Sequence, residues 1–427
     1  MLRASIRALS FGAALPVALC AQTVAITGGT VYPVSGPKIE SGTVLMRDGK
    51  IVAVGAHVSI PAGATRIDAT GKWVTPGLIN ASTQLGLSEA GGTGFSGGYD
   101  DRSAQGAKGI AAAFNAWTAV NPASAFIMPA RQAGITSVMV HPSGTLLSGR
   151  AAMLDLAGET VSAMTIRAPV AMTGTLDPAG GLSQSRAEAV AALREVLSDA
   201  KTYAARKQAF ENNQTRALAA TRADLEALGP VVAGALPLAL NVNRASDIRA
   251  ALALAKEFSL KLIVTGGAEA WEVAAELAAA KVPVMVGAMD NIPENFSLLG
   301  QRQENAALLR AAGVHVTLVG NGPGDEENFN VGNIRQEAGN AVAYGMSWDD
   351  ALRAVTLAPA EAFGVADRVG SLQAGREANV VIWSGDPFEF TTRAEQVFIR
   401  GAVQGGVSRQ DELAQRYRNG VPAYLKR

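Results

Sequence analysis

The feature that most constrains the fold is an alternation, between residues 77 and 364, of short apolar runs with alanine-rich helical segments. This rhythm is typical of βα units, which build a parallel sheet. Helical patterns follow several of the runs, at 245–257, 268–280 and 347–357. Seven runs have the length and composition of strands: 78–80, 135–140, 168–172, 237–242, 261–265, 282–286 and 314–319. A (β/α)8 barrel needs eight strands. Residues 184–228 have helical composition, so the position of the eighth strand stays open.

The two ends of the chain have a different texture. Residues 24–74 and 369–404 alternate short β-branched runs with turns, and Asp48-Gly49 between two such runs is a strong hairpin signal. We therefore predict an α/β protein, a TIM-like (β/α)8 barrel with a small β-sandwich assembled from both termini. The expected domains are the composite sandwich (23–76 and 365–408), the barrel (77–364) and a C-terminal helix or tail (409–427).

The first 21 residues have the pattern of a secretory signal peptide. Arg3 and Arg7 precede an apolar run, Leu9 to Leu19, and small residues follow it. We expect cleavage after Cys20 or Ala21 and a periplasmic or secreted protein. Lipidation at Cys20 stays open, although the residue before it is not small. Cys20 is the only cysteine, so the mature chain would have no disulfide and no thiolate.

Composition argues against two kinds of partner. The formal net charge is zero and only 17% of the residues are charged, which favours neither nucleic acid nor an anionic membrane surface. After the first 21 residues, no apolar run is long enough to span a bilayer.

The segment Val74-Thr-Pro-Gly-Leu-Ile-Asn-Ala-Ser-Thr-Gln-Leu-Gly86 resembles the stretch with which the amidohydrolase superfamily begins its barrel. The segments 131–140, 345–364 and 370–389 resemble that superfamily too, and the nearest branch is imidazolonepropionase-like or dipeptidase-like. The resemblance implies one or two metal ions. These are held by a His-x-His pair after the first strand, a histidine after each of strands five and six, and an aspartate after strand eight.

The resemblance also shows where this chain departs from its family. Asn80 and Asn379 replace aspartates of the family pattern. Neutral side chains occupy every metal-ligand position: Ser82 and Gln84, then Asn241 (or Asn243), Thr265 (or Gly266), and Asn321. Hydroxyl and amide groups are poor Zn²⁺ ligands beside imidazole and carboxylate. We therefore expect a pocket without a metal cofactor, with zinc or another divalent metal as the alternative.

Two other residues are candidates for catalysis. His141 directly follows the run 135–140, and Asp325 follows the last strand, so both would lie on the functional face of a barrel. Asp100 and Asp101 could also line its mouth, although loop acids are usually solvated. His57 and His315 have positions that suit solvated or structural histidines.

A serine nucleophile would need a base. The serines at 82, 143 and 148 lack the Gly-x-Ser-x-Gly context, and His141 would have to serve one of them across a loop.

Two hypotheses follow. The first is an exported amidohydrolase homologue that has lost its metal site. It would be non-catalytic or dependent on a partner, either an active relative or a second copy, and would bind a small-molecule or peptide-like ligand. The second is an active hydrolase of carbon–nitrogen bonds in a cyclic amide or dipeptide-like substrate, through a relocated or single-metal site built from His141 and loop acids. Without a metal, nothing lowers the pKa of a hydrolytic water toward neutrality.

Overall fold

The computed structural model describes residues 23–89, 100–104, 106–144, 146–177, 185–214, 216–289, 293, 295–320 and 330–418. The expected signal peptide, Asn321 and Asp325 lie outside the described residues.

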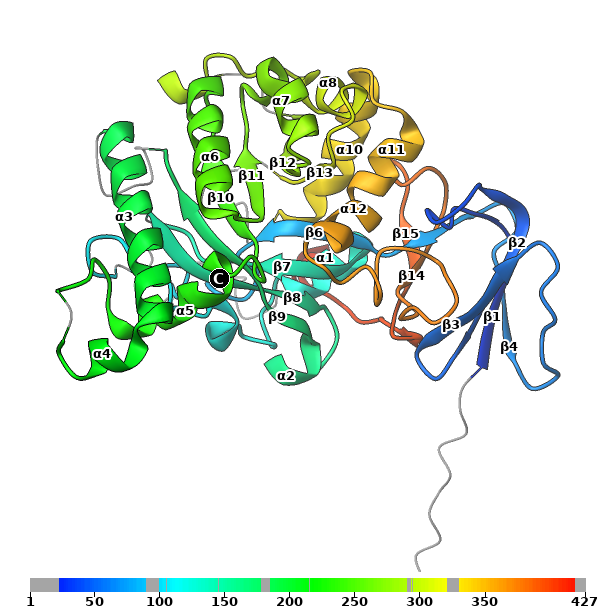
Figure 1. Cartoon of the computed structure of the whole chain (residues 1–427). Helices are drawn as coiled ribbons and strands as arrows, with labels where there is room; N and C mark the ends of the chain where they lie inside the picture. Colours follow the sequence, from blue (N-terminus) through cyan, green and yellow to red (C-terminus); the bar gives the residue numbers. More distant parts are fainter. Residues whose placement is uncertain are drawn as a thin grey trace, which may run out of the picture.

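An eight-stranded sheet forms the centre of the molecule, and its strands follow one another in chain order (Figure 1). Its first and last strands lie close together, although no ladder joins them within the described residues, so the barrel is nearly closed. This confirms the TIM-like barrel. The strands are β6 (Leu78–Thr83), β7 (Ile135–Val140), β8 (Leu147–Asp155), β9 (Thr165–Thr175), β10 (Leu238–Val242), β11 (Leu262–Gly266), β12 (Val284–Val286) and β13 (Val316–Leu318).

The eighth strand is β8, and it runs antiparallel to both of its neighbours. The other neighbouring strands are parallel, so β7, β8 and β9 form a meander within an otherwise parallel barrel. Sequence reasoning missed β8 because Gly149 and Arg150 interrupt its apolar pattern. Pairing on both edges holds the strand in place regardless. Residues 184–228 instead supply the helices α3 (Arg186–Ala205), α4 (Lys207–Glu211) and α5 (Arg222–Val232).

Two clusters of buried hydrophobic side chains pack against the barrel strands, one inside the barrel and one outside it. The interior cluster contains Ile79, Met139, Ala239, Ile263 and Met285, with α12 (Leu357–Ala362) packed against it. A second, larger cluster lies between the outer face of the strands and the surrounding helices.

Helix α6 (Ala245–Phe258) illustrates the outer layer, because its buried residues recur every three or four positions and it ends at Ser259 in the left-handed conformation. The remaining helices are α1 (Ile127–Gln132), α2 (Val161–Met164), α7 (Ala274–Ala279), α8 (Asn305–Ala311), α10 (Ile334–Ala343) and α11 (Trp348–Ala354), with short 3-10 turns η1 (Ala116–Ala119), η2 (Ala270–Val273), η3 (Phe296–Leu298) and η4 (Val331–Asn333).

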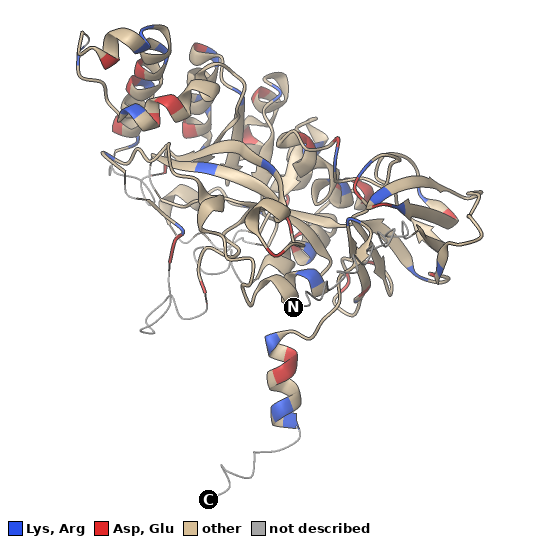
Figure 2. Ribbon diagram, turned by 90° about the horizontal axis from the view of Figure 1, so that it is seen from below, with Lys and Arg blue, Asp and Glu red and all other residues tan. Residues whose placement is uncertain are grey.

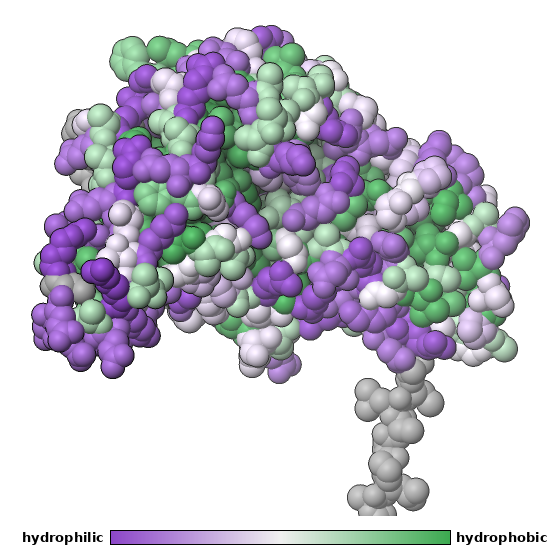
Figure 3. All heavy atoms as spheres, in the orientation of Figure 1, coloured by the Kyte–Doolittle hydropathy of each residue, from purple (hydrophilic) through white to green (hydrophobic). Residues whose placement is uncertain are grey.

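Both ends of the chain contribute to a second eight-stranded sheet, called here the terminal sheet, which lies beside the barrel (Figure 1). This confirms that the two termini assemble one β structure. The ladder is continuous, because β1 pairs along one edge with β4 and then with β5. Hydrophobic surface gathers over this sheet, whereas hydrophilic residues cover much of the helical layer (Figure 3). Its strands are β1 (Thr23–Val31), β2 (Ile39–Arg47), β3 (Lys50–Gly55), β4 (Thr65–Asp68), β5 (Trp73–Pro76), β14 (Val380–Trp383), β15 (Ala394–Ile399) and β16 (Ala402–Val403).

The last described helix, α13 (Arg409–Arg418), projects away from the rest of the molecule and carries charges of both signs (Figure 2). Across the described surface, basic and acidic residues are interspersed (Figure 2). Among the helices of the described ranges, none combines the length and the apolar character that a membrane crossing requires.

Candidate functional site at the carboxyl ends of the barrel strands

A bulge at the end of β6 lies beside the candidate site. Asn80 pairs with Val138 and Thr83 with Val140, so β6 has one residue more than β7 over this stretch. Ile79 and Ala81 belong to the interior cluster, and the extra residue lies between Asn80 and Thr83, where Ser82 Oγ contacts the His141 side chain. Bulges of this kind re-aim side chains, and here a serine lies in the bulge at the functional end of the barrel.

Ser82 and His141 meet across the first two strands. Ser82 Oγ lies 3.1 Å from His141 Nε2, and both residues are half-buried. His141 Nδ1 lies 3.0 Å from the carbonyl oxygen of Pro142, which can only accept a hydrogen bond. Nδ1 of the neutral imidazole therefore carries the hydrogen, Nε2 is the acceptor, and the Ser82 hydroxyl donates to it. His141 was the sequence candidate, and the structure selects Ser82 from the three serines considered beside it.

Asn80 holds the bulge. Its Oδ1 accepts the Ser82 backbone N–H at 3.1 Å, and its Nδ2 donates to the Val331 carbonyl at 3.0 Å. An ionised aspartate could accept the first bond but could not donate the second. Asn80 thus ties β6 to the segment after β13.

Gln84 is 1% exposed, and its Nε2 has no hydrogen-bond partner among the described residues. A buried N–H group without a partner costs about 1–3 kcal/mol. A ligand oxygen at this position would remove that cost.

A second polar group lies at the ends of β9, β10 and β11. Thr175, Asn241 and Thr265 occupy one row of the sheet in register. Asn243 Nδ2 lies 3.0 Å from Asp177 Oδ2 and 3.5 Å from Asn241 Oδ1. Sequence reasoning missed Asp177, because it expected the third strand to end at 172 whereas β9 continues to 175. Among the described residues, no hydrogen bond joins this group to Ser82 and His141.

The loop acids do not complete a site around His141 in the described structure. Asp100 forms a bidentate ion pair with Arg102, at 2.8 Å to Nε and 2.7 Å to Nη2, and this pairing keeps its pKa below the usual value. Asp101 is exposed. Asp325, the other acid candidate, is not among the residues that the structure describes.

The side chains at the positions that the resemblance assigns to metal ligands do not fit a zinc ion. Ser82 is engaged with His141, Gln84 offers an amide, and Asn241 and Thr265 are neutral. Gly266 has a positive φ of 80°, and a Cβ there would approach Asn243 Oδ1 to 2.5 Å, which leaves no room for a ligating side chain. Within the described ranges, no three His, Cys, Asp or Glu side chains gather closely enough to hold a metal.

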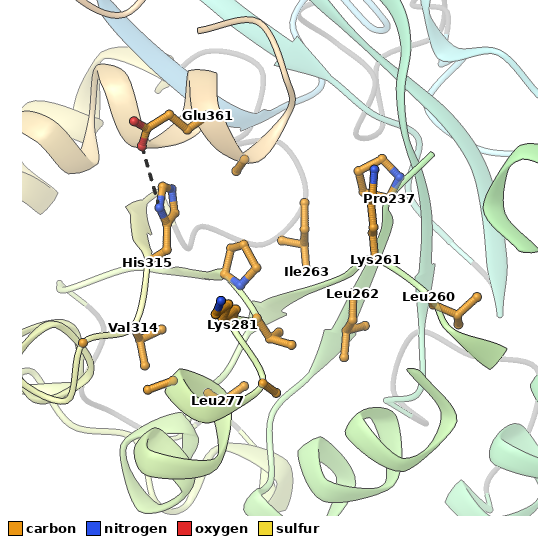
Figure 4. Close-up of a pocket in the computed structure, with 16 residues that line it drawn as sticks. Pro237, Leu260, Lys261, Leu262, Ile263, Leu277, Lys281, Val314, His315 and Glu361 are labelled. Carbon is orange, nitrogen blue, oxygen red and sulfur yellow. Dashed lines mark ion pairs between the residues drawn. The ribbon is translucent and has the colours of Figure 1, made fainter. Parts of the chain in front are cut away.

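A cavity of about 640 Å³ opens at the opposite, amino-terminal end of β10 to β13 (Figure 4). His315 there faces Glu361, with Nδ1 3.8 Å from Oε2, and its Nε2 lies 2.8 Å from the Ala358 carbonyl oxygen. His315 is thus a hydrogen-bonded structural residue, as the sequence suggested. Barrel enzymes place their chemistry at the carboxyl ends of the strands, so this cavity is separate from the candidate site.

Known proteins are similar to this chain in sequence and in fold. The amidohydrolase family model matches residues 73–408. The imidazolonepropionase of Acidiphilium cryptum (strain JF-5) is 26% identical over 375 residues, which cover 82% of this chain and 89% of that protein. An amidohydrolase structure from Thermotoga maritima MSB8 has a TM-score of 0.80 and 26% identity, covering 90% of this chain and 99% of that one. A molinate hydrolase structure (TM-score 0.54, 19% identity, 90% and 95% covered) shares the fold alone. The family match spans most of the sequence, and the chain therefore belongs to the amidohydrolase family.

Proposed function

We propose that this protein is an exported amidohydrolase homologue that works without a resident metal. It binds a small amide- or peptide-like ligand at the carboxyl ends of its barrel strands, beside an active relative or a second copy of itself. The observation that carries this proposal is the donor set, in which each described metal-ligand position holds a neutral side chain.

The surrounding structure supports binding rather than collapse of the pocket. The barrel has its full set of eight strands, and its polar residues at the strand ends are ordered by hydrogen bonds, as between Asn243 and Asp177. The unpartnered Gln84 amide is suited to a carbonyl oxygen, which the ring of an imidazolone and a peptide both carry. A buried donor of this kind gives specificity, because a ligand that lacks the matching acceptor leaves it unsatisfied.

The test is metal analysis of the purified protein after growth with added zinc, manganese and iron. We expect transition metal far below one equivalent per chain, because neutral oxygen donors bind Zn²⁺ too weakly to retain it. A chelator should leave the melting temperature unchanged. The matched positive control is the triple variant Ser82→His, Gln84→His, Asn241→His, which should gain zinc binding, since imidazoles return to positions where the family has them.

The alternative is a hydrolase of carbon–nitrogen bonds with a relocated metal centre. The membership of the chain in the amidohydrolase family supports it. Near-stoichiometric zinc, or chelator-sensitive hydrolysis of an imidazolone or a dipeptide by the unmodified protein, would establish this alternative instead.

Export of the protein is tested separately. N-terminal sequencing of protein from its native host should give a start near Ala21 or Gln22, and an intact Met1 would contradict it.

A further inference from the structure

We infer that Ser82 is a nucleophile and His141 its general base, so that the barrel can form a covalent acyl adduct without a metal. This goes beyond ligand binding and uses the same end of the barrel. Two independent observations carry it: the contact between the two side chains, and the unpartnered amide of Gln84 two residues further along the chain.

The contact has the geometry that an activated serine needs. The distance of 3.1 Å from Oγ to Nε2 lies within hydrogen-bond range, and the Pro142 carbonyl fixes the imidazole so that Nε2 is the basic nitrogen. In other serine hydrolases a third group orients the base, and a backbone carbonyl fills that role here. Ser82 is half-buried, so part of the residue remains accessible at this end of the barrel.

Gln84 supplies the second requirement, a donor for the carbonyl oxygen. Gln84 follows the last residue of β6 and lies two residues after Ser82 in the chain. Its Nε2 is buried and has no partner among the described residues. A preorganised N–H group of this kind stabilises the negative charge that develops on a carbonyl oxygen under attack.

The chemical step balances without an added cofactor. The Ser82 Oγ–H bond breaks as its proton passes to His141 Nε2, and a bond forms between Oγ and the carbonyl carbon. The bond from that carbon to the leaving oxygen or nitrogen then breaks, and the proton on Nε2 passes to the leaving group. A water molecule then attacks the ester carbon as His141 Nε2 takes one of its protons; the bond from that carbon to Ser82 Oγ breaks, Oγ takes the proton from Nε2, and the acid is released. The structure favours activated esters and strained amides, because no charged side chain among the described residues assists the imidazole.

The experiment uses p-nitrophenyl acetate on the purified protein, with nitrophenolate release followed by absorbance and the adduct located by peptide mass mapping. We expect a burst near one equivalent and an acetyl group on Ser82. Ser82→Ala should abolish this adduct, and His141→Asn should slow its formation by about 100-fold, the usual effect of removing a general base. Ser82→Cys should restore a covalent adduct as a thioester, a result that a merely structural hydroxyl would not give.

Ser143→Ala is the matched control, because Ser143 lies two residues from His141 and has no role in the proposed step. It should react like the unmodified protein. Gln84→Met, which keeps the size but removes the donor, should slow acylation without moving it from Ser82. An unmodified protein with no adduct on Ser82, or with the same acetylation pattern as Ser82→Ala, would overturn the inference. Metal content is measured on the same sample, so failure of the metal-free function and failure of the nucleophile are distinguishable.

Discussion

At the scale of single residues, two buried asparagines, Asn80 and Asn379, have the same physical explanation. Each donates a hydrogen bond that an ionised carboxylate could not. Asn80 donates to the Val331 carbonyl. Asn379 donates to Asp155 Oδ1 at 2.8 Å and to Ser137 Oγ at 3.3 Å, where β14 meets the barrel. The second case also avoids placing a further carboxylate beside the buried Asp155.

The prediction for this scale is that Asn379→Asp destabilises the protein by about 2–4 kcal/mol at neutral pH, because it buries an additional negative charge beside Asp155. The loss of stability should be smaller at acidic pH, where the protonated carboxyl introduced by Asn379→Asp can donate a hydrogen bond as the amide does. Chemical denaturation at both pH values measures it. Asn212→Asp makes the same change at an exposed position and should alter stability by no more than about 0.5 kcal/mol. Equal effects of the two substitutions would contradict this account.

At the scale of elements, the turns that lead into the barrel strands connect the two sheets. Gly134, between α1 and β7, has a φ of 84°, and a Cβ there would lie 2.1 Å from Cη2 of the fully buried Trp383. Trp383 belongs to β14 of the terminal sheet and donates through Nε1 to Thr75 Oγ1 at 2.8 Å. The glycine is therefore required twice, by its backbone conformation and by the indole ring against it.

Gly313 separates these two requirements. It occupies the corresponding turn before β13 with a φ of 87°, but no atom lies within 4 Å of the position that a Cβ would take. Gly313→Ala should cost about 1–2 kcal/mol, the penalty of a left-handed conformation. Gly134→Ala should cost about 1–3 kcal/mol more, since the added methyl group overpacks the tryptophan. Thermal unfolding of both variants checks the difference, and similar losses would show that the contact with Trp383 is not tight.

At the scale of the whole molecule, a buried carboxyl pair lies where the barrel joins the terminal sheet. Burial, followed by the charge of the nearby Glu377 carboxyl and a hydrogen bond with it, raises the pKa of Asp155 to about 7. Glu377 Oε2 has no hydrogen-bond partner among the described residues, and a protonated Asp155 carboxyl can donate to it. Arg400 Nε, 3.5 Å from Asp155 Oδ2, favours ionisation, but burial outweighs it. Arg368 and Lys50 face Glu377.

This pair predicts a pH dependence of stability. A carboxyl whose pKa is raised by folding contributes most to stability below its unfolded pKa of about 3.9, and that contribution is lost as the pH rises through about 7. The melting temperature should therefore fall between pH 5 and pH 8, measured at roughly constant ionic strength. Asp155→Asn should flatten this slope, whereas the exposed Asp367→Asn should leave it as in the unmodified protein. A slope that survives in Asp155→Asn would reject the carboxyl pair as its source.

The sequence by itself determined the barrel, the terminal sheet and seven of the barrel strands, because apolar periodicity and turn residues act over a few neighbours. It also placed His141 directly after a barrel strand, as the structure has it, since residue type at a strand end is readable from the chain; its role and the loss of metal ligands stay predictions. It did not place β8, whose two partner strands hold it in spite of a broken pattern.

Only the tertiary structure decided the site. The partner of His141 is Ser82, which lies in the bulge of β6, and a hydrogen bond from its backbone N–H to Asn80 Oδ1 holds it there. Likewise, the reason for Asn379 is a contact with Asp155, 224 residues away in the chain. Patterns along a sequence report which face is buried. Which two polar groups meet on that face is set by register and by contacts between distant segments, and these exist only in the folded molecule.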